Sequence, residues 1–196
     1  MLRAVAQALW LSVPVVLAGV LHMLVVRRGW LRGLAVPLDR GHTLGGQPVL
    51  GPNKTWRGVL VMPAAGAIFG ALQGALAGPW TAGLDPVDFA RLGGGSSVAG
   101  HALVGAVLGA GYILGELPNS FAKRRARVAP GAQGKGALRW LFTMVDQVDS
   151  VLVGLALGAV AFRYPVAVVA AGTVVLPLVH LAVTLVLHKA KLKEAL

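Results

Sequence analysis

Two carboxylates three residues apart, Asp146 and Asp149, lie inside a long apolar segment of the sequence. If a helix begins near Leu138, Asp146 is about 12 Å along its axis, well inside the hydrocarbon region of a bilayer. Residues three apart share a helix face, and each charge at that depth costs on the order of 2.5–3.5 kcal/mol, so the pair needs partners. Two convergent carboxylates suit a hard divalent cation such as Mg²⁺. A proton relay and an ion pair with a neighbouring helix are the alternatives.

A second polar cluster, residues 115–125, ends the preceding apolar segment. Three of its side chains and one just beyond it fall on one helix stripe at about 100° per residue: Glu116, Ser120, Lys123 and Arg127. Pro118 is expected to kink that helix or to begin a new one. An acid, a hydroxyl and the basic pair Lys123-Arg124 suit a phosphate site with a metal ligand beside it. The alternative is a cationic anchor at the membrane surface, and Arg125 is assigned to that anchor.

A third cluster, residues 51–58, precedes the second apolar segment. It joins glycines, which free the backbone, to polar side chains that suit a phosphate: Asn53, Lys54, Thr55 and Arg57. It is not a Walker motif, because the required spacing is absent. Trp56 is interpreted as a residue of the aromatic belt at the membrane interface. The five histidines are scattered, and His101, His180 and His188 are expected at helix ends or in packed faces.

The composition describes a membrane protein. The chain has 196 residues, 56% of them hydrophobic and 13% charged, with a mean hydropathy of +0.73, against about 45–50% and about 25% in soluble proteins. Five apolar segments are long enough to span a bilayer: 4–26, 59–80, 98–117, 138–162 and 165–187. We therefore expect an all-α integral membrane protein with about five transmembrane helices and a polar cavity on the cytoplasmic side, in which residues 1–196 form a single membrane-embedded catalytic domain. The sequence has no cysteine, which excludes disulfides and thiolate chemistry.

The basic residues predict the topology. They gather in the first loop, the third loop and the carboxyl-terminal tail, which an odd number of spans places on one side. The positive-inside rule makes that side cytoplasmic. The amino terminus is then expected on the outer face of the cell's inner membrane. All three polar clusters then lie near the cytoplasm, and a net charge of +11 favours anionic partners such as phosphates, lipid head groups and nucleotides. We expect no nucleic acid as a partner. Glycine-rich faces predict close helix packing and hint at a homo-oligomer such as a dimer.

These motifs together resemble a known family. Residues 115–124, followed by Asp146-Gln147-Val148-Asp149, resemble the pattern G-D-x-x-x-S-x-x-K-R and D-[RQ]-x-D of the phosphatidate cytidylyltransferase superfamily. The form Ser-Phe-x-Lys-Arg-Arg, the Asp-Gln pair and the short chain are similar to its CDP-archaeol synthase branch. Residues 53–58 resemble the K-T-W-[ER]-G element of both branches. Glu116 stands where the pattern has Asp, and the H-G-G element of the bacterial phosphatidate enzymes is absent.

The resemblance implies a Mg²⁺-dependent reaction in which CTP and a lipid phosphate give a CDP-lipid and pyrophosphate. It assigns the catalytic residues, which are Asp146, Asp149, Lys123 and Arg124. It also assigns the metal ligands, which are Asp146, Asp149 and Glu116. The residues that it assigns to substrate binding are Asn53, Lys54, Thr55, Arg57, Ser120 and Asp39.

Two alternatives to that reaction stay open. One is a phosphatidate cytidylyltransferase that acts on ester lipids. The other is a transporter of a phosphate-bearing or cationic solute, in which the two aspartates bind a coupling ion. Many transporters contain inverted repeats, and the sequence shows none.

A lipid phosphate is already an anionic nucleophile, so the cytidylyl transfer needs no serine or cysteine nucleophile. The transfer does need neutralisation of the charge on its two anionic substrates.

Overall fold

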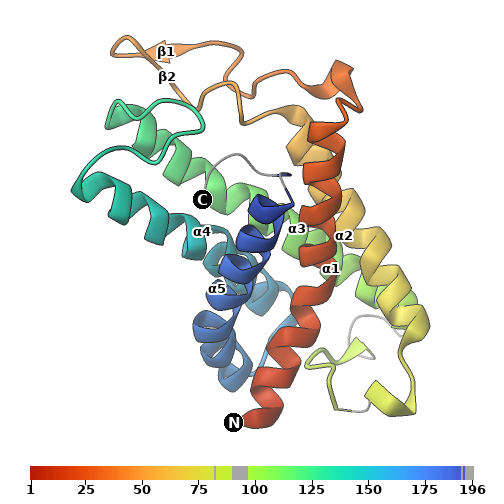
Figure 1. Ribbon diagram of the computed structural model, residues 1–196. Helices are drawn as coiled ribbons and strands as arrows, with labels where there is room; N and C mark the ends of the chain where they lie inside the picture. Colours follow the sequence, from red (N-terminus) through yellow and green to blue (C-terminus); the bar gives the residue numbers. More distant parts are fainter. Residues whose placement is uncertain (82, 90–96, 191, 193–196) are drawn as a thin grey trace.

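Five long helices make up most of the computed structural model, which describes residues 1–81, 83–89, 97–190 and 192. The helices are α1 (Leu2–Arg27), α2 (Trp56–Leu76), α3 (Ser97–Arg125), α4 (Ala137–Phe162) and α5 (Val166–Lys189) (Figure 1). Each is long and apolar enough to cross a membrane. The predicted all-α membrane protein with five spans is therefore confirmed.

Two helix boundaries differ from the prediction. The second apolar segment was expected to reach Trp80, but α2 ends at Leu76 and Trp80 lies in a short 3₁₀ turn, η2 (Pro79–Thr81). The third was expected to end at Leu117, with Pro118 kinking the helix or beginning a new one; α3 continues through that proline to Arg125, so no new helix begins there. Membrane helices accommodate an interior proline because neighbouring groups satisfy the freed backbone carbonyl. Arg127 lies beyond α3 with a φ of 56°, so it does not continue the predicted stripe.

Glycines bring α3 close to its neighbours. The helix α3 packs against α2 on one side and α4 on the other, while α1 packs against α2 and α5. A Cβ atom added at Gly105 would lie 2.0 Å from the carbonyl oxygen of Gly66, and one at Gly109 would lie 2.4 Å from that of Met62. Backbone therefore touches backbone at these positions, as predicted from the spacing of small residues.

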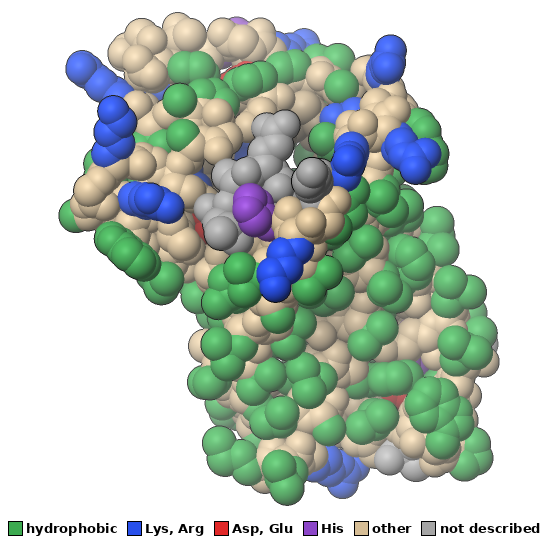
Figure 2. Space-filling view, in the orientation of Figure 1, with side chains coloured by type: hydrophobic (Ala, Val, Ile, Leu, Met, Phe, Trp, Pro, Cys, Tyr) green, Lys and Arg blue, Asp and Glu red, His purple; other side chains and the backbone are tan. Residues whose placement is uncertain are grey.

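The loops before α2 and before α4 lie at the same end of the bundle (Figure 1). The first, loop one (residues 28–55), contains a 3₁₀ turn, η1 (Arg32–Leu34), and a hairpin of β1 (Thr43–Leu44) and β2 (Gln47–Pro48) paired antiparallel. The other, loop three (residues 126–136), joins α3 to α4. Figure 2 shows Lys and Arg side chains around this end and hydrophobic side chains over the body below. The predicted grouping of the two basic loops on one side is confirmed.

Candidate active site

The predicted carboxylate pair converges on one side chain of α3. Asn119 is buried, and its Nδ2 donates to Asp146 Oδ1 at 2.5 Å and to Asp149 Oδ2 at 2.7 Å. Asp149 also accepts hydrogen bonds from the backbone and hydroxyl groups of Ser150. Sequence reasoning assigned no role to Asn119, although it lies in the quoted motif three residues after Glu116. The two aspartates, one helical turn apart on α4, thus form a single polar centre with Asn119.

Lys123 completes this centre from the end of α3. Its Nζ lies 2.7 Å from both carboxylate oxygens of Asp146 and 2.8 Å from Gln133 Oε1. Gln133, from loop three, donates in turn to Asp146 Oδ2 at 2.6 Å. Lys123 is buried, and its ammonium group lies 5.6 Å from the centre of the Phe142 ring. A charged amine buried in this way holds Asp146 and loop three together. No sequence pattern singles out Gln133, which is one amide in a basic, glycine-containing loop.

Arg124 is the most deeply buried cation of the site, with 3% of its surface exposed. Its Nη2 donates to the carbonyl of Ala129 in loop three at 3.1 Å. In the described part of the chain, its buried Nε and Nη1 atoms have no hydrogen-bond partner. Loop one covers it, because a Cβ at Gly51 would lie 3.7 Å from Arg124 Cδ and 3.3 Å from Pro130 Cγ. Buried donors without acceptors are costly, so this guanidinium is suited to an anion.

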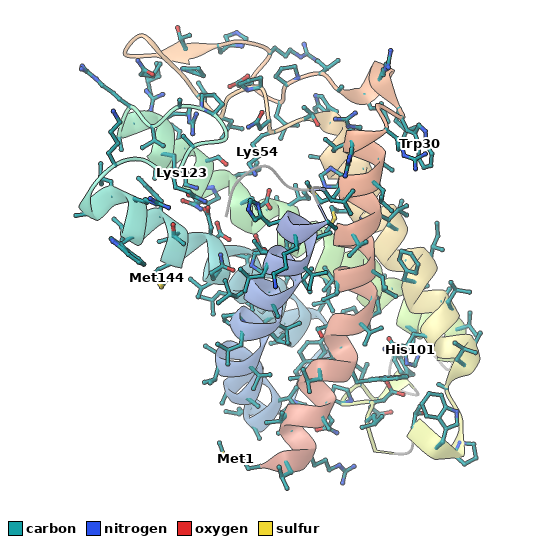
Figure 3. The ribbon with its side chains drawn as sticks, in the orientation of Figure 1. Met1, Trp30, Lys54, His101, Lys123 and Met144 are labelled. Atoms are coloured by element: carbon teal, nitrogen blue, oxygen red, sulfur yellow. The ribbon has the colours of Figure 1, made fainter. Side chains whose placement is uncertain are left out.

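Glu116 lies one turn before Asn119 on α3 and forms an ion pair with Lys54 from loop one. Among the described residues, no three His, Asp or Glu side chains form a group that could hold a metal ion. The structure therefore places Glu116 in a lysine pair beside the aspartate centre. Figure 3 shows Lys54 and Lys123 at the same end of the bundle, with His101 near the other.

The other predicted substrate-binding residues surround this centre at varying distance. Asn53 faces loop three, since a Cβ at Gly131 would lie 3.6 Å from its Nδ2. Thr55 precedes the first residue of α2, and Arg57 in its first turn donates to the carbonyl of Trp30 at 3.2 Å. Ser120 is half-buried and follows Asn119 on α3.

Asp39 organises loop one from within. Its Oδ2 accepts hydrogen bonds from the backbone N–H groups of Leu50 and Gly51, both at 2.8 Å, and its Oδ1 accepts one from Gly41 at 3.1 Å. Burial raises the pKa of Asp39, but these N–H groups outweigh it, and its pKa lies below the ordinary value. Asp39 therefore shapes the segment that leads to Lys54.

Arg125 was predicted as a cationic anchor at the membrane surface, and in the structure it also binds loop one. Its guanidinium donates to three backbone carbonyls of the hairpin, those of Leu44, Gln47 and Pro48, the last at 2.6 Å. It also lies over the ring of Phe121, 5.2 Å from its centre. The end of α3 thus holds loop one through Arg125 and loop three through Lys123 and Arg124.

A family model described as CarS-like CDP-archaeol synthase matches residues 1–196. The chain belongs to the CDP-archaeol synthase family. It is 36% identical to the CDP-archaeol synthase of Halobacterium salinarum over 159 residues, 77% of each chain. It is 27% identical to that of Pyrococcus furiosus over 199 residues, 98% of each chain. The family resemblance predicted from the motifs is confirmed.

A solved structure also resembles this member of the family. That structure is described as an intramembrane enzyme for archaeal membrane lipid biosynthesis. The two share a TM-score of 0.58 and 26% sequence identity, over 91% of this chain and 92% of the other. The five-helix architecture is thus that of an intramembrane enzyme.

Proposed function

We propose that this member of the CDP-archaeol synthase family transfers the cytidylyl group of CTP to the phosphate of a membrane lipid. The relatives' names support an ether lipid of the archaeol type as the acceptor. The observation that carries the proposal is Arg124, whose two buried nitrogens lack partners in the described residues and which follows Lys123, the partner of Asp146, on α3. A triphosphate supplies the anionic oxygens that such a guanidinium needs.

The reaction balances without a protein nucleophile. An oxygen of the lipid phosphate attacks the α-phosphorus of CTP, a new P–O bond forms, and the bond to the bridging oxygen of the β-phosphate breaks. Pyrophosphate leaves with that electron pair. Because the attacking phosphate is already anionic, no side chain has to remove a proton. Lys123 and Arg124 bind and neutralise the triphosphate, and loop three, which they hold, excludes water from it together with loop one, which Arg125 holds.

The aspartate centre fits a divalent cation. One oxygen of Asp146 and one of Asp149 lie within 2.7 Å of a single nitrogen, that of Asn119. The Oδ1 of Asn119 is also buried, without a partner in the described chain. Carboxylate and amide oxygens are the donors that Mg²⁺ prefers. In this proposal Asp146 and Asp149 hold the cation, and Glu116, predicted as a third ligand, stays with Lys54. When bound, the cation supplies charge neutralisation at the triphosphate.

The orientation is part of the proposal. The basic residues of loops one and three favour the cytoplasmic side for the end that carries the site. CTP then enters from the cytoplasm, while the hydrocarbon chains of the acceptor stay in the bilayer beside the helices. An aqueous nucleotide and a membrane lipid can meet at a site built at that boundary.

A direct assay tests the activity. Purified protein is incubated with radiolabelled CTP and Mg²⁺, together with a dialkylglycerol phosphate, a diacylglycerol phosphate or no lipid. We expect labelled CDP-lipid and equimolar pyrophosphate, with the ether lipid preferred. Lys123→Ala should lower turnover on the order of tenfold to a hundredfold, since a hydrogen bond to a charged group contributes about 1.5–3 kcal/mol. Arg28→Ala, an exposed cation at the end of α1, is the matched control. No labelled product with either lipid overturns the proposal.

A further inference from the structure

The Asp146 carboxylate is saturated with hydrogen-bond donors. Asn119 donates to its Oδ1 at 2.5 Å, and Gln133 donates to its Oδ2 at 2.6 Å. The Nζ of Lys123 lies 2.7 Å from each of the two oxygens. An ionised carboxylate has about four acceptor positions, two on each oxygen. These contacts fill all of them, so a metal cation can bind Asp146 only after one of the donors leaves.

Lys123 is the donor whose departure would open Asp146 most. It contacts both oxygens of the carboxylate, so its loss frees one acceptor position on each. The loss of Asn119 or Gln133 would free a position on one oxygen alone. These two donors are neutral amides, whereas Lys123 carries a full positive charge. The ammonium group therefore occupies the position on Asp146 that suits a bound cation.

The charges of the aspartate centre favour replacement of this ammonium group by a divalent cation. Asp146 and Asp149 carry two negative charges, and the cation bonded to them is Lys123. The third acid of the site, Glu116, is already paired with Lys54. One lysine leaves the two aspartates with an excess negative charge, whereas a divalent cation in the same position balances both.

Lys123 cannot bind a phosphate fully while it holds Asp146. Its ammonium group has three N–H donors, and the two oxygens of Asp146 and the Oε1 of Gln133 accept all three. Arg124 is the next residue of α3, and its buried Nε and Nη1 lack partners among the described residues. A triphosphate bound at Arg124 supplies acceptor oxygens for Lys123 as well. The flexible four-carbon stem of the lysine lets its ammonium group turn toward them without a shift of the helix.

Gln133 contacts both partners of the Lys123–Asp146 ion pair. Its Oε1 accepts a hydrogen bond from Lys123, while its Nε2 donates to Asp146. One amide of loop three thus fixes the lysine and the aspartate relative to each other. Because the amide carries no charge, its removal changes the binding of a cation through the position of Lys123 and not through the net charge of the site.

We propose that Lys123 occupies the divalent-cation position on Asp146 until a triphosphate draws it away, and that Gln133 is the positioning residue that keeps it there. The inference rests on the proposed function and adds a coupling between two of its ligands. A triphosphate that takes the ammonium group opens Asp146 to the divalent cation. The two ligands then bind cooperatively, because both favour the same displaced position of Lys123.

Binding of Mn²⁺ alone tests this coupling, since Mn²⁺ prefers the same oxygen ligands as Mg²⁺. Electron paramagnetic resonance measures its affinity for the purified protein without CTP or lipid. Lys123→Met removes the ammonium group and keeps a long side chain beside the Phe142 ring, so Mn²⁺ should bind about tenfold tighter than to wild type. Gln133→Ala should bind Mn²⁺ about threefold to tenfold tighter, because the lysine is held less firmly. Lys135→Met, an exposed cation of the same loop, is the matched control and should stay within about twofold of wild type.

The Gln133 variant separates the proposal from simple charge repulsion. Removal of a nearby positive charge strengthens the binding of any cation, but Gln133→Ala changes no charge. If Gln133→Ala binds Mn²⁺ no tighter than wild type, or if Lys123→Met gains no more affinity than Lys135→Met, the proposal is wrong. At saturating CTP, Gln133→Ala and wild type should need the same Mg²⁺ concentration for half-maximal activity within about twofold, because Lys123 has then left Asp146. A much lower requirement in the variant would contradict the proposal.

The same measurements distinguish this inference from the proposed activity. If the variants bind Mn²⁺ as expected but the wild-type protein forms no CDP-lipid, the proposed activity fails and the role of Lys123 on Asp146 stands. If the wild-type protein forms CDP-lipid but neither Lys123→Met nor Gln133→Ala gains affinity for Mn²⁺, the activity stands and the inference is wrong.

Discussion

Gly115 on α3 lies directly against the backbone of Asp149 on α4. A Cβ added at Gly115 would lie 2.7 Å from the Asp149 carbonyl oxygen and 2.7 Å from Ser150 Cα, closer than real Cβ contacts allow. This contact lets the two helices approach until Asn119, one turn further along α3, reaches both aspartates.

Replacing Gly115 by alanine should therefore separate α3 from α4 at the aspartate centre. We predict that Gly115→Ala costs about 1–3 kcal/mol of stability through overpacking. Cytidylyl transfer should fall by more than tenfold, because small displacements of catalytic groups are costly. Gly19→Ala on α1 is the control, since nothing lies within 4 Å of its added Cβ. Thermal unfolding and turnover are measured for Gly115→Ala and for Gly19→Ala, and only Gly115→Ala should lose stability and turnover. Equal behaviour would show that the Gly115 contact is not required.

The two aspartates should be separately essential. Asp146→Asn removes the charge that pairs with Lys123, and Asp149→Asn removes the other carboxylate held by Asn119. Each variant should lose turnover on the order of a hundredfold while it stays folded, and each should bind Mn²⁺, measured by electron paramagnetic resonance, more weakly than wild type. Full Mg²⁺-dependent activity in Asp146→Asn would exclude the assignment.

The sequence could predict the parts of this protein that depend on local pattern. Apolar length predicted the five helices, spacing predicted that Asp146 and Asp149 share a helix face, and the family resemblance added Lys123 to the site. Other features depend on how elements pack, which a single sequence does not reveal. Gln133 reaches Asp146 because loop three folds back over α4. A local rule allows either a kink or a new helix at Pro118, and only the packed structure shows that α3 continues through it.

The role of Arg125 is a second feature that depends on packing and that a single sequence does not reveal. A run of basic residues at a helix end is typical of an anchor at the membrane surface, and composition cannot distinguish that role from a structural one. The three carbonyl acceptors of Arg125 belong to a hairpin nearly 80 positions away in the sequence. The backbone trace of loop one, which no local pattern predicts, creates the interaction.

We predict that Arg125→Ala loosens loop one. The lost charge-assisted hydrogen bonds contribute about 1.5–3 kcal/mol, so trypsin should cleave the loop at Arg40 more than tenfold faster. The KM for CTP should rise as the loop covers Arg124 less of the time. Arg125→Lys should resemble Arg125→Ala, because an ammonium group cannot replace the planar guanidinium. Arg28→Ala serves as the charge-matched control. Unchanged cleavage in Arg125→Ala would return this residue to a purely surface role.

The orientation can be tested directly because the chain has no cysteine. Leu44→Cys places an exposed thiol on the hairpin, and Asp88→Cys places one on the loop between α2 and α3. A membrane-impermeant maleimide should label Asp88→Cys in intact cells. It should label Leu44→Cys only after the cells are opened. The reverse pattern would place the active site outside the cytoplasm and contradict the proposed entry of CTP.

The pKa of Asp39 predicts how loop one responds to acid. Three backbone N–H groups stabilise its carboxylate, so its pKa in the folded protein is below the ordinary value of about 3.9. A group with a lowered pKa contributes stability that is present above the ordinary pKa and is lost as the pH falls through the folded pKa. Protection of the Leu50 and Gly51 amides from hydrogen exchange should therefore be constant down to about pH 4 and should fall below it.

Asp39→Asn separates this effect from general acid unfolding. Asn offers one acceptor oxygen and no charge, so the variant should show weaker protection of Leu50 and Gly51 at neutral pH and no transition below pH about 4. The amide of Leu38 is an internal control, because it donates to the carbonyl of Lys54 at 2.8 Å and not to a titrating group. Its protection should change little with pH in either protein. If Leu38 lost protection in parallel with Leu50, the whole loop would be unfolding by another route, and Asp39 would not be the group that controls it.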